Sequence, residues 1–346
     1  MTSLNPDIEN FINTLRNKSS GLIPIAELGV HPFIKGKFIG REIINLKDDI
    51  EFWYKAGYDY IKLQPVADFN PMKIGVQDKV TFNDDGSVFR KWASEGKGVI
   101  SNHDDLDNYV FPSINDFDYS NFEKVKSLLP DGMGVVGQYG DIFTMTWEMM
   151  GFETFSLALF EDPELIDQLN KTIGDLVLSM FEYFVQSDKV NAIWYSDDIA
   201  YTNGLLVSPD VLDKYFFPWL KQIGDLSKKY NKPLIYHSDG ILYDVFEKII
   251  DCGVNAIHPI EPKAMDIKDV KKRYGNKLCL MGNIDVDLLS RGTKEEVRKV
   301  VLNNIESVGM ESGYCAGSGN SIPEYVIFEN YLTMIQTVKE FNGQTN

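Results

Sequence analysis

Cysteine is scarce in this sequence, and long hydrophobic runs are absent. The 346-residue chain has three cysteines, Cys252, Cys279 and Cys315, and none of them forms a CxxC pair. This odd, sparse set argues against a disulfide framework and excludes a zinc site built from thiolates alone. The segment Met1–Lys18 is polar, without the apolar core of a signal peptide, and no later run is long enough to span a bilayer. We therefore expect a cytoplasmic protein that does not contact membranes.

Basic residues are also in short supply. Lysine and arginine total 34 against 51 aspartates and glutamates, which gives a net charge of -17. Nucleic acids and anionic membranes are bound by clustered basic side chains, so neither is an expected partner. Small molecules or proteins are the expected partners instead. The 44% hydrophobic and 25% charged content is ordinary for a soluble globular protein.

A repeated pattern fills the chain: short apolar runs stop abruptly on polar residues. Parallel strands that are buried on both faces read as such runs, and in barrels their polar carboxyl ends carry the chemistry. Helical periodicity fills the gaps between the runs. The pattern predicts an α/β fold, a (β/α)8 TIM barrel, as a single domain over residues 1–346. The eight predicted strands are Leu22–Glu27, Tyr58–Leu63, Met133–Gln138, Asn191–Tyr195, Leu234–His237, Val254–His258, Leu278–Gly282 and Tyr314–Ala316.

Helix starts and one long insertion complete the expected architecture. Four helices have clear signals: one opened by Asp162-Pro163 and running to about Gln186, one opened by Ser208-Pro209 and running to about Tyr230, one after a capping box at Thr293–Glu296, and a last one over Pro323–Phe341. Residues 68–129 are longer than a helical crossover needs. We interpret them as an insertion after the second strand that roofs the barrel mouth, with a hairpin turn at Asn83–Gly86 and a further segment from His103.

Polar residues at the strand tips are expected to converge on the mouth of the barrel. His237 and Asp239 are two apart, so on an extended strand they face the same side and could share a metal ion with Glu261 at the next tip. The alternative is that the aspartates cap helices and that His237 bonds a carbonyl. We predict catalytic roles for His237, Asp239, Asp198 and Glu261, of which His237, Asp239 and Glu261 form the predicted metal site. The residues predicted to bind substrate are Glu27, His31, Glu148, Trp194, Tyr236 and Asn320.

An ordered set of motifs resembles the uroporphyrinogen decarboxylase superfamily over nearly the whole chain. The motifs are Trp147–Glu153, Asp197-Asp198 followed by Leu206–Pro209, His237–Gly240, Pro259–Pro262, Gly282–Asp285 and Gly319–Pro323. Each motif is weak alone, but their order is specific. The resemblance implies a (β/α)8 barrel independently of the strand count.

The superfamily contains haem-pathway decarboxylases and methyltransferases that use corrinoid proteins. The decarboxylases hold tetrapyrrole propionates with arginines in an early glycine-containing segment, but here no arginine lies between Arg16 and Arg41. The methyltransferases bind zinc through His-x-Cys, and His237 matches that histidine. Asp239 replaces the first cysteine, while Asn320 falls near the second. The resulting harder site favours oxygen donors over thiols.

The resemblance therefore implies an O-demethylase-like methyltransferase. It would move a methyl group from a small-molecule donor, favoured as a methoxylated aromatic, to a cobalt(I) corrinoid protein. Zinc is the expected metal, cobalamin is expected only through the partner corrinoid protein, and a homodimer is compatible with the sequence. A metal-free lyase with Asp198 or His237 as proton donor is the alternative enzyme, and a binding module without turnover is the third class.

Overall fold

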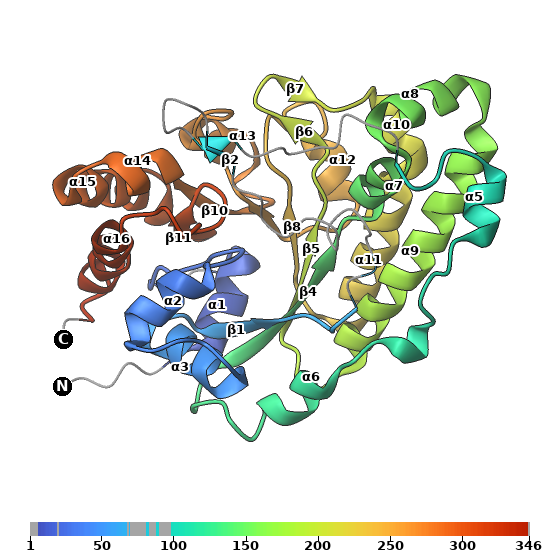
Figure 1. The fold of residues 1–346 in the computed structure, drawn as a ribbon. Coiled ribbons are helices and arrows are strands. Elements are labelled where there is room, and N and C mark those ends of the chain that lie inside the picture. The colour runs from blue at the N-terminus through green and yellow to red at the C-terminus, as the bar shows by residue number, and fades with distance from the viewer. Residues whose placement is uncertain are drawn as a thin grey trace.

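A curled parallel sheet forms the centre of the molecule (Figure 1). The computed structural model describes residues 6–18, 21–67, 69, 81–82, 88–89 and 98–344. Seven strands pair in the order β1-β4-β5-β8-β9-β10-β11, and every pair between neighbours is parallel. These strands are β1 (Tyr60–Leu63), β4 (Gly134–Gly140), β5 (Ala192–Ser196), β8 (Leu234–His237), β9 (Ala256–His258), β10 (Cys279–Ile284) and β11 (Tyr314–Ser318). They confirm seven of the eight predicted strands.

The first predicted strand, Leu22–Glu27, is present only as an isolated bridge between Ile25 and Ala316. Ala26 donates its backbone N–H to the carbonyl of Ala316, whose own N–H bonds the carbonyl of Pro24. Proline has no N–H to donate, so Pro24 stops the ladder on the amino-terminal side, and on the other side the N–H of Ser318 bonds the Glu27 side chain instead of the backbone. The segment lies beside β11, where the eighth strand was expected, and the fold is barrel-like rather than a continuous ladder of eight strands.

Helices surround the sheet in the described part of the chain (Figure 1). None of these helices is both long enough and apolar enough to cross a membrane. Their bounds are α1 (Ile8–Leu15), α2 (Pro32–Ile39), α3 (Leu46–Ala56), α5 (His103–Asn108), α6 (Ser120–Val125), α7 (Ile142–Met150), α8 (Phe152–Glu161), α9 (Pro163–Gln186), α10 (Pro209–Tyr215), α11 (Phe217–Tyr230), α12 (Phe246–Asp251), α13 (Ile267–Tyr274), α14 (Val286–Arg291), α15 (Lys294–Asn304) and α16 (Phe328–Phe341), with short turns at η1 (Ile114–Asp116) and η2 (Ile305–Gly309).

Three of the four predicted helix starts are confirmed, whereas the last helix, α16, begins at Phe328 rather than at Pro323. Asp162 accepts a hydrogen bond from the backbone of Leu165 at the start of α9, and Thr293 forms the expected capping box at the start of α15. The helix expected from Ser208-Pro209 to about Tyr230 is instead two helices, α10 and α11, that break at Phe216. Pro218 explains the break, because a proline without an N–H is tolerated only in the first turn of a new helix.

Residues 98–129 of the predicted insertion do not lie over the barrel mouth. Residues 98–129 carry α5 and α6, which pack outside α9 (Figure 1). Tyr119 stacks on Tyr183 of α9 with ring centroids 3.8 Å apart. β2 (Thr81–Phe82) and β3 (Val88–Phe89) pair antiparallel, while the turn predicted at 83–86 lies outside the described residues. A roof over the mouth stays a prediction for the remainder of the segment.

One end of the barrel is closed by α1. Phe11, Ile12 and Leu15 of this helix join the inner core cluster that also contains Tyr60 and Trp194. Phe11 stacks on Tyr60 with ring centroids 4.6 Å apart. The N–H of Ile8 at the start of α1 donates to the carbonyl of Gly132, which precedes β4, so α1 lies at the amino-terminal end of the strands. The carboxyl-terminal end is therefore where a functional site can open.

Candidate active site

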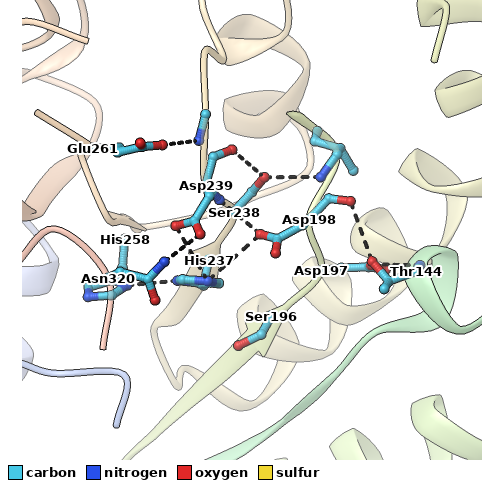
Figure 2. A network of polar contacts seen from close by, with 12 residues as sticks. Thr144, Ser196, Asp197, Asp198, His237, Ser238, Asp239, His258, Glu261 and Asn320 are labelled. Carbon is cyan, nitrogen blue, oxygen red and sulfur yellow. Dashed lines mark hydrogen bonds and ion pairs between the residues drawn. The ribbon is translucent and has the colours of Figure 1, made fainter. Parts of the chain in front are cut away.

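Three polar side chains converge at the carboxyl ends of β5 and β8 (Figure 2). His237 is the last residue of β8, Asp239 lies two residues further on, and Asp198 lies two residues beyond β5. His237 Nε2 is 3.8 Å from Asp198 Oδ1 and 4.0 Å from Asp239 Oδ1. We call Asp198, His237 and Asp239 the strand-tip cluster.

Burial controls the protonation of this cluster. It lowers the pKa of His237 to about 3, with a further contribution from the charge of Lys62, so the imidazole is neutral at neutral pH. Burial also raises the pKa of Asp239 to about 8, helped by repulsion from Asp198 and Glu261. Without a cation, the cluster therefore combines a neutral imidazole and a protonated carboxyl group.

The strand-tip cluster can hold a metal ion. Each of its residues offers one ligand atom, and these atoms lie within 4.8 Å of one another. Asp239 Oδ1 is buried and has no hydrogen-bond partner, as expected of an acceptor that a cation would satisfy. One imidazole nitrogen and two carboxylate oxygens are donors that suit zinc at ~2.0–2.2 Å or a similar divalent ion. The residues present thus fit a divalent metal, without selecting one metal over another.

Neighbouring residues hold the cluster in position. His237 and His258 share a hydrogen bond between their Nδ1 atoms at 2.8 Å, which orients Nε2 of His237 toward the carboxylates. Asn320 donates through Nδ2 to Asp239 Oδ2, and the N–H of Asp239 donates to Asp198 Oδ1 at 2.9 Å. Asn320, predicted to bind substrate, therefore lies beside the cluster and bonds one of its acids.

Glu261 lies next to the cluster but is not one of its members. Its Oε2 accepts the N–H of Gly240 at 2.9 Å, and Figure 2 shows it on the far side of Asp239 from His237. The predicted metal site consisted of His237, Asp239 and Glu261, whereas the structure groups Asp198 with His237 and Asp239; metal binding by Glu261 stays a prediction. Strand pairing does not decide this, because β5 and β9 both lie beside β8; the difference is that Asp198 Oδ1 lies 3.8 Å from His237 Nε2, whereas Glu261 Oε2 bonds the N–H of Gly240.

Asp197 has a different task from its neighbour Asp198. It is fully buried, and its carboxylate accepts the N–H groups of Phe143 at 2.7 Å and Thr144 at 2.9 Å at the start of α7. The hydroxyl of Tyr195 donates to it at 2.6 Å. Asp197 thus ties the first turn of α7 to the end of β5, as an N-terminal cap does.

Comparison with known proteins identifies the family. A profile described as uroporphyrinogen decarboxylase (URO-D) matches residues 99–341, which include the whole strand-tip cluster. The chain belongs to the uroporphyrinogen decarboxylase family. This family of enzymes was expected from the ordered motifs of the sequence, and that expectation is confirmed.

Two kinds of relative are similar to this family member. The uroporphyrinogen decarboxylase of Chlorobaculum tepidum is 23% identical over 71% of the chain and 73% of its own length. That of Pseudoalteromonas translucida is 35% identical, over 54% of the chain and 51% of its own length. Among solved structures, a methyltransferase from Methanosarcina mazei superposes over 99% of both chains, with a TM-score of 0.67 and 16% identity. At that identity the likeness shows the fold alone.

Cysteines do not contribute to the strand-tip cluster of this family member. Cys279 of β10 and Cys315 of β11 are fully buried in the inner core of the barrel, with sulfur atoms 3.9 Å apart. Cys315 lies inside its strand, as expected from the sequence. Oxygen and nitrogen donors alone therefore surround the candidate metal position.

The other residues predicted to bind substrate are scattered. Trp194 is fully buried on the inner face of β5, beside His258, with ring centroids 5.0 Å apart. Tyr236 lies on the opposite face of β8 from His237, packed in the outer core, with its hydroxyl donating to the carbonyl of Asp197. The period-two alternation of a strand explains this separation from the mouth.

Two further predicted residues do not join the strand-tip cluster. His31 is half-exposed and caps α2, accepting the backbone N–H of Phe33 through Nδ1. Its Nε2 lies 3.9 Å from a carboxylate oxygen of Glu324. Glu148 lies on α7, partly buried, where its carbonyl accepts the N–H of Gly151. These positions place His31 at a surface ion pair and Glu148 on a helix, and substrate contact by either stays a prediction.

Glu27 is fully buried and fastens the first segment to β11. Its Oε1 accepts the N–H of Ser318 at 2.7 Å, and its Oε2 contacts the Ser318 hydroxyl. Burial raises the pKa of Glu27 to about 8. A proton on Oε2 completes the network, because Glu27 then donates to Ser318 Oγ, which can donate in turn to the carbonyl of Asn320 at 3.0 Å.

Glu27 should make stability depend on pH. Its folded pKa of about 8 lies above the ordinary value of 4.5, so the native state keeps a proton that the unfolded chain releases. Stability should therefore fall as the pH rises between these two values, by on the order of 3–4 kcal/mol from this residue. Glu27→Gln should mimic the protonated acid, so its free energy of unfolding should lack the part of the pH dependence that comes from Glu27. Urea unfolding at pH 5 and pH 8.5 checks this, and parallel pH curves for the two proteins would contradict it.

Two inward-facing residues near the site were missed as functional candidates in the sequence. Lys62 is the one charged residue of β1, two positions after Tyr60 on the inner face. His258 ends β9 two positions after Ala256, which also faces inward. The sequence does carry a signal for both. Every second residue of a strand faces the same side, so a polar residue two positions after an inward apolar residue is also expected to face inward.

Proposed function

We propose that this enzyme transfers a methyl group from a small methylated donor, favoured as a methoxylated aromatic, to a cobalt(I) corrinoid protein. The observation that carries the proposal is the strand-tip cluster, a compact set of oxygen and nitrogen donors at the end of the barrel opposite α1. Such donors suit activation of an ether oxygen better than of a thiol. The fold shared with a methyltransferase from Methanosarcina mazei is compatible with this reaction.

The cluster can assist cleavage of a methyl–oxygen bond. Cobalt(I) of the corrinoid substrate would attack the methyl carbon, and the bonding electron pair would leave with the ether oxygen. Asp239, kept protonated by burial and by its acidic neighbours, can give that oxygen a proton as the bond breaks. The products are methylcobalt(III) and a free hydroxyl compound. Alternatively, a divalent ion held by Asp198, His237 and a deprotonated Asp239 would supply Lewis-acid polarisation of that oxygen in place of the proton.

The orientation of His237 supports this role. Its Nδ1 is engaged by His258, so Nε2 faces the position where the oxygen would lie between Asp198 and Asp239. Because the imidazole is neutral, it can accept a proton or bind a metal but carries no charge that would repel one. The protein thus provides binding and polarisation, while the corrinoid provides the nucleophile.

A decarboxylase reaction is the second candidate. The curated relatives are named uroporphyrinogen decarboxylase, and a protonated Asp239 could protonate the carbanion left after loss of carbon dioxide. Against this reaction, the carboxyl groups of Asp198, Asp239 and Glu261 gather at the strand tips, where an anionic tetrapyrrole would be repelled. We therefore rank methyl transfer first.

A single assay separates the two reactions. The purified enzyme is mixed with a reduced corrinoid protein and with methoxylated benzenes, methoxybenzoates or methylamines, and the absorption change from cobalt(I) to methylcobalt(III) is followed. We expect methylation with at least one donor and no product from uroporphyrinogen. Decarboxylation of uroporphyrinogen at an enzymatic rate, with no methylation from any donor, would contradict the proposal and show that the enzyme is a decarboxylase.

A further inference from the structure

Lys62 places an amine inside the barrel. It lies on β1, and the alternation of the strand puts it on the same inner face as Tyr60. Its Nζ lies 5.5 Å from the ring centroid of Trp194, which comes from the inner face of β5. Tyr60 is fully buried, whereas Lys62 as a whole residue is partly exposed.

No acid pairs with this amine among the described residues. The closest acidic candidates are engaged elsewhere: Asp49 forms an ion pair with Lys35, and both carboxylate oxygens of Glu27 contact Ser318. Burial, together with the charge of Lys35, lowers the pKa of Lys62 to about 7. A buried amine without a counter-charge is costly, so its retention calls for a ligand that supplies the charge.

Unsatisfied polar atoms lie between Lys62 and the strand-tip cluster. Trp194 Nε1 and His258 Nε2 are both buried without a hydrogen-bond partner in the described structure. Trp194 lies beside both the Lys62 amine and the His258 ring. His258 in turn bonds His237. Polar atoms without hydrogen-bond partners therefore lie along the way from Lys62 to the strand-tip cluster.

We infer that Lys62 binds the carboxylate of the methyl donor, so that the enzyme selects anionic donors over neutral ethers and amines of the same shape. The identity of the ligand as a methyl donor rests on the proposed function, but binding of its carboxylate by Lys62 does not require turnover. A ligand whose acid group meets Lys62 would extend past the buried Trp194 toward His237. Lys62 is then a specificity-determining residue.

Matched acid and amide probes test this inference without corrinoid or turnover. Binding of 3-methoxybenzoate and 3-methoxybenzamide is measured by calorimetry, and methoxyacetate with methoxyacetamide forms a second, smaller pair. The wild-type enzyme should bind an acid ~10–100-fold more tightly than its amide, as expected for a partly desolvated charge pair. Lys62→Met should bring that ratio to about one, while Lys62→Arg should keep part of it.

Two controls keep a folding defect or a failed function from being mistaken for a result. Lys263→Met removes a lysine that already pairs with Asp287, so the acid-to-amide ratio should not change. Lys62→Met should also raise the thermal midpoint of the ligand-free protein, because it removes an unpaired buried amine. The inference fails if the wild type binds amides as tightly as acids, binds no acid at all, or keeps its ratio in Lys62→Met. Selective acid binding without methyl transfer would overturn the proposed reaction but leave Lys62 in its role.

Discussion

His237→Ala is expected to lose the bound metal and to lower the rate of corrinoid methylation by ~10²–10⁴-fold. The imidazole is neutral and buried, and its Nε2 faces both Asp198 and Asp239, so the substitution removes the nitrogen ligand of the strand-tip cluster. The variant also leaves the Nδ1 atom of His258 without its partner. Metal analysis of protein purified without chelator, together with cobalt(I) loss in single turnover, measures both effects.

A second histidine provides the matched control. His103 is half-exposed and pairs with Asp162 at the surface, outside the cluster, so His103→Ala should keep the wild-type metal content and rate. Full metal retention in His237→Ala would remove His237 from the metal site. A native protein that is fully active without metal would leave His237 as an acid–base residue, with no role in metal binding.

The sequence predicted the two cluster members that share a strand. His237 and Asp239 follow one apolar run at a spacing of two, and strand geometry alone places them on the same side. The third member depended on where the loop after each strand beside β8 places its acid, which the sequence does not record. Glu261 was expected because it follows the next apolar run in the chain, whereas β5 on the other side of β8 delivers Asp198.

Seven strands were predicted because parallel strands buried on both faces are continuous apolar runs. The failures have local causes. Pro24 interrupts the ladder of the first segment, and Pro218 divides one expected helix into α10 and α11. Both effects come from the missing N–H of proline, which an apolar pattern does not reveal. Residues 98–129 pack outside α9 because aromatic rings such as Tyr119 and Phe122 find partners there.

Functional residues inside the barrel were harder to predict than those at its mouth. Lys62 and His258 sit within apolar strands, where a polar residue looks like an exception in the pattern. The inner face of a barrel becomes polar near its carboxyl end, so the last inward position of each strand belongs to the site. Tyr236 was predicted to bind substrate, but its neighbour His237 faces inward. The alternation of the strand therefore places Tyr236 on the outer face, toward the helices.

Asp197 and Asp198, adjacent in the chain, should respond in opposite ways to alanine substitution. Asp197→Ala removes the acceptor of two helix N–H groups and of the Tyr195 hydroxyl, all buried. Its free energy of unfolding should fall by ~2–4 kcal/mol, because these donors lose their partner without gaining water. The side chain of Asp198 is 39% exposed, so Asp198→Ala should change stability by less than about 1 kcal/mol.

Activity should show the reverse order. Asp198→Ala removes one of the three ligand atoms of the cluster, so metal content should drop and methyl transfer should slow by at least ~10²-fold. Asp197→Ala leaves all three ligand atoms in place and should keep most of its activity per folded molecule at low temperature. Urea unfolding and single-turnover methylation of both variants give a two-by-two comparison. A stable, inactive Asp197→Ala variant beside an unstable, active Asp198→Ala variant would contradict the assignment, because it would place the chemistry at the residue that caps α7.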